Sequence, residues 1–146
     1  MIYTIGFTQS SAQHFFERLR DNRVGLLVDV RLNNHSQLAG FAKFPDIKWF
    51  LRELCQTEYI LDDLLAPTAE ILDAYRKSTI DWNLYEHYFE ELMRDRNIDV
   101  HIEKHYMDHS GNHIALLCSE PTPEQCHRRL VAAHFSKVLK AEIRHL

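Results

Sequence analysis

Residues 113–130 read HIALLCSEPTPEQCHRRL, and this stretch decides the fold class. The apolar run Ile114–Leu117 predicts a short strand that is buried on both faces. Thr122 is suited to cap a helix, Pro123 suits the first helical position, and Gln125 completes a capping box. The sequence therefore predicts a strand, a tight loop and a helix that begins at Thr122.

Two further strands precede this unit. Met1–Ile5 predicts a strand that ends at Gly6, and Ser10 with Gln13 forms a capping box for the helix that follows. Val24–Val30 is apolar nearly throughout, as in a central parallel strand. Strand, helix and strand at this spacing predict a right-handed βαβ unit.

The middle of the chain alternates between helical and extended patterns. We expect a short helix capped by Asp46, a strand over residues 59–61 and a helix opened by Pro67 and Thr68. The clearest amphipathic helix begins at Asp81, and its aromatic stripe is interpreted as core rather than as a cofactor site.

The C-terminal third is less regular. Residues 97–112 stay ambiguous, although Val100 and Ile102 favour a strand. Residues 139–144 alternate apolar and charged side chains, which predicts a strand at a sheet edge. We predict a single α/β domain over residues 1–146, with a mostly parallel sheet flanked by helices in a Rossmann-like three-layer arrangement and a C-terminal edge strand.

Composition narrows the cellular setting. The chain has 146 residues, a formal net charge of −4 and three cysteines. No stretch is apolar enough to span a membrane, so we expect a cytoplasmic protein with reduced thiols and no disulfide. The net charge argues against a nucleic-acid protein, and the basic stretch 126–146 is interpreted first as solvated surface.

Polar side chains follow each predicted strand. Thr8 follows the first strand, and Asp29 and Arg31 end the second. The third strand is followed by Cys118, Ser119 and Glu120. Parallel strands that are neighbours bring these groups to one edge of the sheet, which suits acid/base chemistry and anion binding. The alternative is that Asp29 with Arg31, or Glu120 with Arg128, forms an ion pair that fixes a loop.

The predicted helix adds further groups to this edge. At about 100° per residue, Cys126 and His127 face inward, whereas Arg128 and Arg129 point away. The positive helix end together with Arg128 predicts a site for phosphate or sulfate. His127 is interpreted equally well as a core residue and as a catalytic one.

The thiols allow two interpretations. Cys118, near a helix start and a histidine, is a candidate nucleophile, but it is equally a small apolar residue. The sequence lacks the Cys-x5-Arg phosphate loop, because the residue six positions after Cys118 is Glu124. Phosphatases and sulfurtransferases of that type are therefore disfavoured.

Metal and cofactor motifs are weak. Cys118 and Cys126 lie too far apart for a zinc knuckle, and adjacent ligands such as Cys126 and His127 rarely point at one ion from a helix. A histidine recurs every four residues at His101, His105, His109 and His113, but Gly111 interrupts any helix there. No dinucleotide, P-loop or zincin motif occurs. We expect no metal and no cofactor.

Four motifs carry a resemblance to a known family. The block LLCSEP…CHRRL, the run Tyr3–Gly6, the triplet Asp29–Arg31 and the run Gly40–Lys43 resemble the domain-of-unknown-function family numbered 488 (DUF488), over residue 3 to about residue 132. The resemblance implies a single cytoplasmic α/β domain. It implies no activity, because the family is defined without one.

Two functional hypotheses remain. In the first, the protein is an enzyme that acts on a phosphorylated, nucleotide-like or nucleic-acid ligand. Arg31 and Arg128 hold the anion, Glu120 or Asp29 is the acid/base, and His127 orients or shares that task. In the second, the same edge is a non-catalytic site for a ligand or partner. The sequence specifies neither the substrate nor the oligomeric state.

Overall fold

The computed structural model describes residues 1–35, 39–109 and 111–146. Its centre is one five-stranded sheet with the order β3-β2-β4-β1-β5, in which every neighbouring pair is parallel. The strands are β1 (Ile2–Gly6), β2 (Val24–Asp29), β3 (Glu58–Leu61), β4 (His113–Cys118) and β5 (Ile143–His145). The order places β4 between β2 and β1, so the loops that leave these three strands meet at one edge.

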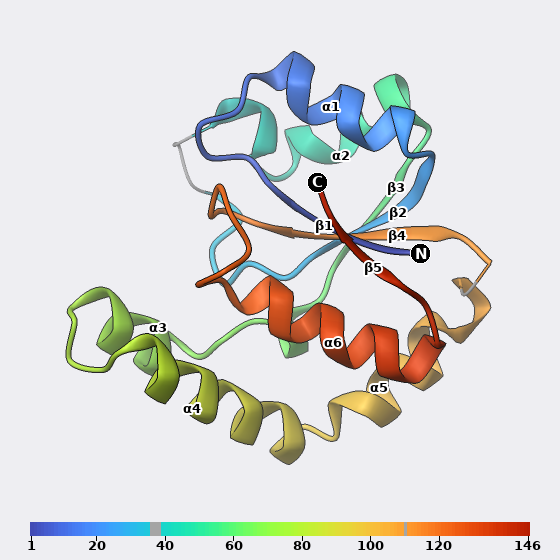
Figure 1. The fold of residues 1–146 in the computed structure, drawn as a ribbon. Coiled ribbons are helices and arrows are strands. Elements are labelled where there is room, and N and C mark those ends of the chain that lie inside the picture. The colour runs from blue at the N-terminus through green and yellow to red at the C-terminus, as the bar shows by residue number, and fades with distance from the viewer. Residues whose placement is uncertain (36–38, 110) are drawn as a thin grey trace.

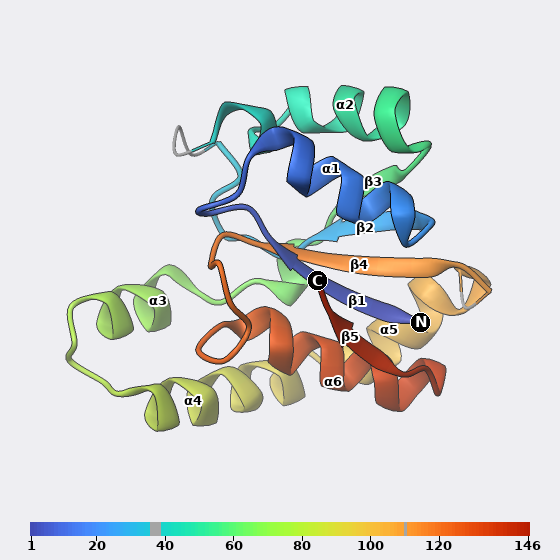
Figure 2. The same cartoon turned by 45° about the horizontal axis from the view of Figure 1, so that its top comes forward.

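Helices cover both faces of the sheet, as Figures 1 and 2 show. Helices α1 (Ala12–Asp21) and α2 (Asp46–Cys55) lie on one face. The other face carries α3 (Ala69–Arg76), α4 (Trp82–Asp95), α5 (Ile98–Tyr106) and α6 (His127–Leu139). Short 3-10 turns occur at Gly40–Ala42, Asp63–Leu65 and Met107–His109. The predicted three-layer Rossmann-like arrangement with a C-terminal edge strand is confirmed.

The alternation of side chains along β4 assigns each residue to one layer. Ala115 and Leu117 pack with α1 and α2, whereas Leu116 and Cys118 pack with α4, α5 and α6. Asp29 lies opposite Leu117 in the parallel register of β2 and β4. Because successive side chains of a strand point to opposite faces, Asp29 and Cys118 project from different sides of the sheet.

Several predicted boundaries need correction. The cap of α1 is Ser11 rather than Ser10, because the Ser11 hydroxyl accepts the backbone N–H of His14 at 3.1 Å. Residues 98–106 form a helix and not a strand. Its buried positions are Ile98, Ile102 and Tyr106, a four-residue spacing that the short alternation of Val100 and Ile102 obscured. Residue 139 ends α6, so the edge strand covers only Ile143–His145.

The start of α6 is the correction that matters for the site. The helix begins at His127, and its cap is Cys126, whose backbone is extended with φ −137° and ψ 132°. Residues 121–125 form bends and turns instead of the predicted first helical turn. The Thr122 hydroxyl does not cap a helix but donates to the carboxylate of Glu124 and lowers its pKa. The connection from β4 to α6 is therefore a loop of eight residues.

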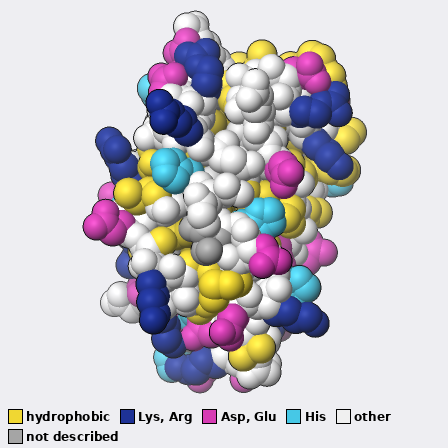
Figure 3. Space-filling view, turned by 90° about the vertical axis from the view of Figure 1, so that its right-hand side faces the viewer, with side chains coloured by type: hydrophobic (Ala, Val, Ile, Leu, Met, Phe, Trp, Pro, Cys, Tyr) yellow, Lys and Arg dark blue, Asp and Glu magenta, His cyan; other side chains and the backbone are white. Residues whose placement is uncertain are grey.

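The exposed surface adds two observations. Every helix within the described ranges is too short or too polar to cross a bilayer. On the face that carries the amino ends of the strands, acidic and basic side chains are interspersed (Figure 3). This face therefore presents a mixed surface and no continuous stripe of one charge.

Candidate functional site

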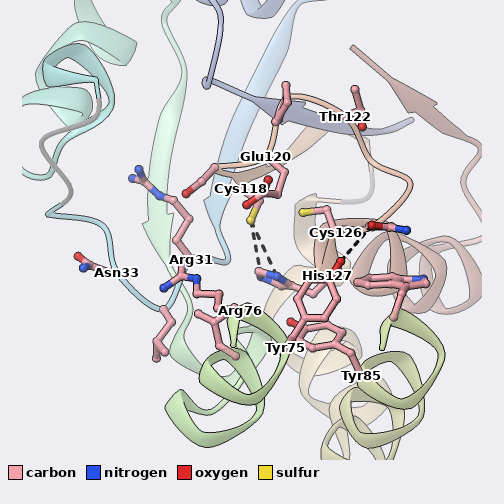
Figure 4. A pocket seen from close by; sticks show the side chains of 16 residues that line it. Arg31, Asn33, Tyr75, Arg76, Tyr85, Cys118, Glu120, Thr122, Cys126 and His127 are labelled. Carbon is pink, nitrogen blue, oxygen red and sulfur yellow. Dashed lines mark hydrogen bonds between the residues drawn. The ribbon is translucent and has the colours of Figure 1, made fainter. Parts of the chain in front are cut away.

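A pocket of about 280 Å³ opens at the carboxyl ends of β2 and β4. Its walls come from four places: the exit of β2 at residues 31–33, the β4–α6 connection at residues 118–122 and 125–127, α3, and the start of α4. Figure 4 shows the side chains converging on this space. In parallel α/β sheets this edge is the usual ligand site, because several loops meet there without blocking one another.

Two thiols and an imidazole form the floor of the pocket. We call Cys118, Cys126 and His127 the thiol cluster; their ligand atoms all lie within 4.8 Å of one another. The Cys118 sulfur lies 3.9 Å from Nδ1 of His127. The Nε2 atom of His127 lies 2.7 Å from the carbonyl oxygen of Val30. The Cys118 sulfur lies almost as close to Nε2, at 4.0 Å. A carbonyl only accepts, so Nε2 donates its proton to Val30, and Nδ1 is the ring nitrogen that stays available to the thiols.

The electrostatics of the thiol cluster favour a thiolate at Cys118. A hydrogen bond from the Cys126 thiol lowers the pKa of Cys118 well below its usual value. Burial acts in the opposite direction and raises this pKa, whereas the positive charges of His127 and Arg128 lower it further. The same hydrogen bond and burial raise the pKa of Cys126. Burial alone lowers the pKa of His127, but the facing thiolate and the Val30 carbonyl raise it overall. These shifts favour negative charge on Cys118 rather than on Cys126, and positive charge on the facing His127.

Arg128 supports the cluster from beneath. Its side chain is fully buried, in contrast to the prediction that it points away. One guanidinium nitrogen, Nη1, donates to the carbonyl of Glu120 and lies 3.5 Å from the sulfur of Cys126. Among the described residues no carboxylate pairs with Arg128. A buried cation without a carboxylate favours a negative charge nearby, and the thiols of the cluster are the groups that can carry it. Arg128 is therefore a structural cation and not an exposed anion clamp.

Gly6 explains the motif at the end of β1. A Cβ atom on Gly6 would lie 1.8 Å from the carbonyl oxygen of Glu120 and 3.1 Å from Nη1 of Arg128. Only a residue without a side chain lets the 118–120 backbone approach so closely. The neighbouring Thr8 donates its backbone N–H to the carbonyl of Ser119 at 3.1 Å. The first strand thus fixes the loop that carries Cys118.

Asp29 and Arg31 form a closed pair next to the pocket. Arg31 donates Nε and Nη2 to the two carboxylate oxygens of Asp29 at 2.8 and 2.6 Å. Tyr59 adds its hydroxyl to the same carboxylate at 2.7 Å. Arg31 still lines the pocket, but Asp29 faces the opposite layer and does not. The expectation that Asp29 shares the pocket as an acid/base is corrected, and the ion-pair alternative is the one found.

Of the other predicted site residues, some line the pocket and some do not. Cys118, Ser119, Glu120 and His127 line the pocket together, and Glu120 is exposed there. Thr8 contributes only its backbone and lies outside the lining. The alternative Glu120–Arg128 ion pair does not occur among the described residues. Arg128 donates instead to the backbone carbonyl of Glu120, which leaves the carboxylate on the pocket wall.

The outer wall of the pocket could not be recognised from the sequence. Tyr75 and Arg76 on α3, with Trp82 and Tyr85 on α4, face the thiol cluster across the pocket. The Tyr75 hydroxyl donates to Gln125 at 3.0 Å and so links α3 to the β4–α6 connection. In the sequence, the aromatic residues among them look like ordinary core positions of two amphipathic helices, and Arg76 looks like an ordinary surface residue. Only the tertiary position of α3 at the end of the sheet distinguishes them.

The structure shows which of the candidate metal ligands lie close together. The thiol cluster is the one group of three ligand-type side chains with suitable spacing in residues 1–35, 39–109 and 111–146. In the histidine series, His101 lies 2.7 Å from the carboxylate of Asp62, and its ring is tilted against that of His105 at 4.6 Å between centroids. His113 lies at the amino end of β4, where its ring nitrogen is 2.7 Å from the carbonyl oxygen of Asn22. The four histidines therefore do not converge on one ion.

Comparison with known proteins completes the description. No curated protein and no solved structure matches the chain. A family model, "Domain of unknown function DUF488", matches residues 11–135, which begins after the Tyr3–Gly6 motif and includes both Asp29–Arg31 and the thiol cluster. The chain, whose sheet edge carries these two groups, belongs to the DUF488 family.

Proposed function

We propose that the protein is a cytoplasmic enzyme that uses Cys118 as a thiolate nucleophile on a small anionic ligand of the phosphorylated or nucleotide-like class. The observation that carries the proposal is the Cys118–His127 pair, 3.9 Å apart, on the floor of a pocket. The second nitrogen of His127 is fixed by the Val30 carbonyl, so the imidazole keeps one orientation. These are the nucleophile, the acid–base group and the group that orients it, which covalent catalysis needs.

The charges around the pocket support an anionic ligand. Arg76 is exposed at the outer wall and supplies positive charge there, whereas the charge of Arg31, which also lines the pocket, is neutralised by Asp29. Arg128 adds a buried positive charge behind the cluster. A pocket with a cation at its rim, Arg76, and an aromatic wall at Tyr75 and Trp82 fits a ligand that joins a phosphate to a planar ring.

The reaction follows from the protons that the cluster holds. The Cys118 thiolate attacks the electrophilic atom of the ligand and forms a bond to sulfur, while the bond to the leaving oxygen breaks. His127 donates the Nδ1 proton to that oxygen. Water then attacks the covalent intermediate, oriented by the exposed Glu120 carboxylate, and returns a proton to His127 as the thiolate leaves. Each cycle restores the starting thiolate and imidazolium.

The test is covalent trapping with turnover. Chelator-treated protein is mixed with p-nitrophenyl phosphate or a nucleoside monophosphate, quenched in acid and examined by intact and peptide mass spectrometry. We expect p-nitrophenol release in the first case and, with either ligand, an adduct on Cys118 that is lost in Cys118→Ser. Cys55→Ser, which removes a thiol outside the pocket, is the matched control.

Ligand binding is measured separately by thermal unfolding in inorganic phosphate, with ionic strength matched by chloride. We expect stabilisation that Arg76→Ala reduces and that Arg94→Ala, an exposed arginine on α4, leaves unchanged. Stabilisation without adduct or turnover would overturn the catalytic proposal in favour of a non-catalytic binding module. The absence of both would overturn the anionic ligand as well.

A further inference from the structure

The thiol cluster has the composition of a transition-metal site. We propose that Cys118, Cys126 and His127 bind one Zn²⁺ ion through Sγ, Sγ and Nδ1, with the fourth position of the tetrahedron open to the pocket. This inference goes beyond the catalytic proposal and does not depend on it. A bound ion takes Cys118 as a ligand, so the metal-loaded and metal-free proteins differ in the reactivity of this thiol.

The distances fit a shared ion. Zinc–sulfur bonds of about 2.3 Å and zinc–nitrogen bonds of about 2.0 Å place the ligand atoms of a tetrahedral site about 3.6–3.8 Å apart. The Cys118 sulfur already lies 3.9 Å from Nδ1 of His127, and the atoms of all three groups lie within 4.8 Å of one another. Shifts of less than about an ångström therefore bring the ligand atoms to tetrahedral spacing.

The surroundings of His127 match those of a metal ligand. Histidines that bind zinc usually donate their second ring N–H to a carbonyl or carboxylate, which fixes the tautomer and the ring orientation. Here Nε2 lies 2.7 Å from the carbonyl oxygen of Val30, so Nδ1 is the nitrogen that remains available to an ion held by the two sulfurs. Phe89 packs against the same ring at 5.5 Å between centroids and restricts its rotation further.

The start of α6 removes the objection to adjacent ligands. Two neighbouring residues inside a helix point about 100° apart and rarely reach one ion. Cys126, however, is the cap of α6 and has extended backbone angles, whereas His127 is the first helical residue. The change of backbone conformation between them turns both side chains toward Cys118, as the close view in Figure 4 shows.

Charge also favours a metal with two thiolate ligands. Arg128 lies 3.5 Å from the Cys126 sulfur and is fully buried, so it stabilises negative charge on that sulfur. Two thiolates and Zn²⁺ are neutral together. Soft sulfur ligands with one imidazole select zinc over magnesium or calcium. Three protein ligands with an open position are typical of zinc sites that also bind a small molecule.

The experiment uses the full chain, reduced with a phosphine and stripped by chelator. Co²⁺ is added first, because a four-coordinate site with thiolates gives intense visible d–d bands and a sulfur-to-cobalt charge-transfer band. Zn²⁺ is then titrated in competition. We expect one Co²⁺ per chain, displaced by one Zn²⁺. Cys126→Ser and His127→Gln should weaken binding by at least about 100-fold, while Cys55→Ser leaves it unchanged.

A second measurement keeps the proposal falsifiable if the variants do not fold. In the wild-type protein, Zn²⁺ at one equivalent should protect Cys118 and Cys126 from alkylation, mapped by peptide mass spectrometry, and should leave Cys55 reactive. Absence of the charge-transfer band, or protection that does not include both cysteines, would overturn the metal site. Because neither measurement contains a phosphorylated ligand, failure of the metal site and failure of the catalytic proposal are separate results.

Discussion

Two clusters of polar residues lie at the same edge of the sheet and behave differently. In the first, Asp29, Arg31 and Tyr59 satisfy one another through three short hydrogen bonds. In the second, Cys118 and His127 face each other at 3.9 Å on the floor of a pocket. The first cluster therefore stabilises the fold, whereas the second retains groups that can react with a ligand.

The difference arises from the alternation of side chains along the strands and from the chemistry of the groups. Asp29 pairs with Leu117 in the sheet register, one residue before Cys118, and so points into the other layer. A carboxylate and a guanidinium that are buried together are stable only as a pair. A thiol and an imidazole tolerate partial solvent access and change protonation near neutral pH. The comparison teaches that proximity to a strand end is insufficient to assign a catalytic group.

The largest effect is expected from breaking the closed pair. Asp29→Ala leaves Arg31 buried without its carboxylate, since both side chains are at most 3 % exposed. We expect a loss of about 3–5 kcal/mol in the free energy of unfolding, measured in denaturant. Asp21→Ala, which removes an exposed carboxylate, should change the value by less than about 0.5 kcal/mol. Equal effects of the two variants would contradict the assignment of Asp29 to a structural pair.

A smaller loss of stability, with a direct effect on the site, is expected at Gly6. Gly6→Ala forces the Glu120 carbonyl away from β1, because the new Cβ would lie 1.8 Å from it. We expect a destabilisation of about 1–3 kcal/mol and slower alkylation of Cys118. Gly40→Ala, where the added Cβ would have no neighbouring atom within 4 Å, is the control and should alter neither. Unchanged alkylation in Gly6→Ala would show that β1 does not position the loop.

Tyr59→Phe sharpens the comparison further. Burial and the neighbouring Asp29 raise the pKa of Tyr59, so its hydroxyl stays protonated and donates throughout the ordinary pH range. Removing that hydroxyl should cost about 1.5 kcal/mol, typical of a hydrogen bond to a charged group. Cys118 alkylation should stay at the wild-type rate, because Tyr59 serves only the closed pair. A change in that rate would show that the two clusters are coupled.

The smallest effect is expected far from both clusters. Asp81 caps α4 by accepting the backbone N–H of Leu84 at 2.9 Å. Asp81→Ala should lower the free energy of unfolding by about 1 kcal/mol, as for other helix caps. Asp81→Ser should recover most of the loss, since serine is also a good cap. Denaturant unfolding of the three proteins measures this, and an unchanged stability in Asp81→Ala would contradict the capping assignment.

The sequence predicted most of the fold because its strongest patterns are local. The strands around Ile114–Leu117 and Val24–Val30, and the caps at Thr68 and Asp81, agree with the structure. The start of α6 was wrong because Thr122 satisfies the rules of a capping box, while the tertiary contacts of Cys126 and His127 decide where the helix begins. The sequence around Thr122 carries no signal of these tertiary contacts, so the true start of α6 could not be predicted from it.

The candidate site was predictable only in part. Cys118 and Glu120 were predicted from the end of the third strand, and His127 from the start of the helix that follows. All three line one pocket. The burial of Arg128 was missed although helical angles allow it, because Arg128 lies on the same face of α6 as Ala132 and Phe135, four and seven residues further on, and both are buried. The outer wall at Tyr75 and Trp82 was missed because its position depends on how α3 packs against the end of the sheet. Side-chain alternation along β2 was the available signal that would have separated Asp29 from the pocket.

The central claim is that Cys118 is a thiolate held by His127 and Cys126. The pH dependence of its alkylation by iodoacetamide, followed by peptide mass spectrometry in the presence of chelator, tests this most directly. The lowered pKa of Cys118 means that the thiolate is present above that pKa and is lost only as the pH falls through it. The raised pKa of Cys55, due to burial, provides the internal comparison.

The account predicts that the Cys118 rate reaches its plateau at a pH well below that of Cys55. It also predicts that His127→Gln moves the Cys118 profile toward the ordinary thiol range, because the positive charge facing the sulfur is removed. A Cys118 profile that coincides with that of Cys55, or one that His127→Gln leaves unchanged, would contradict the account.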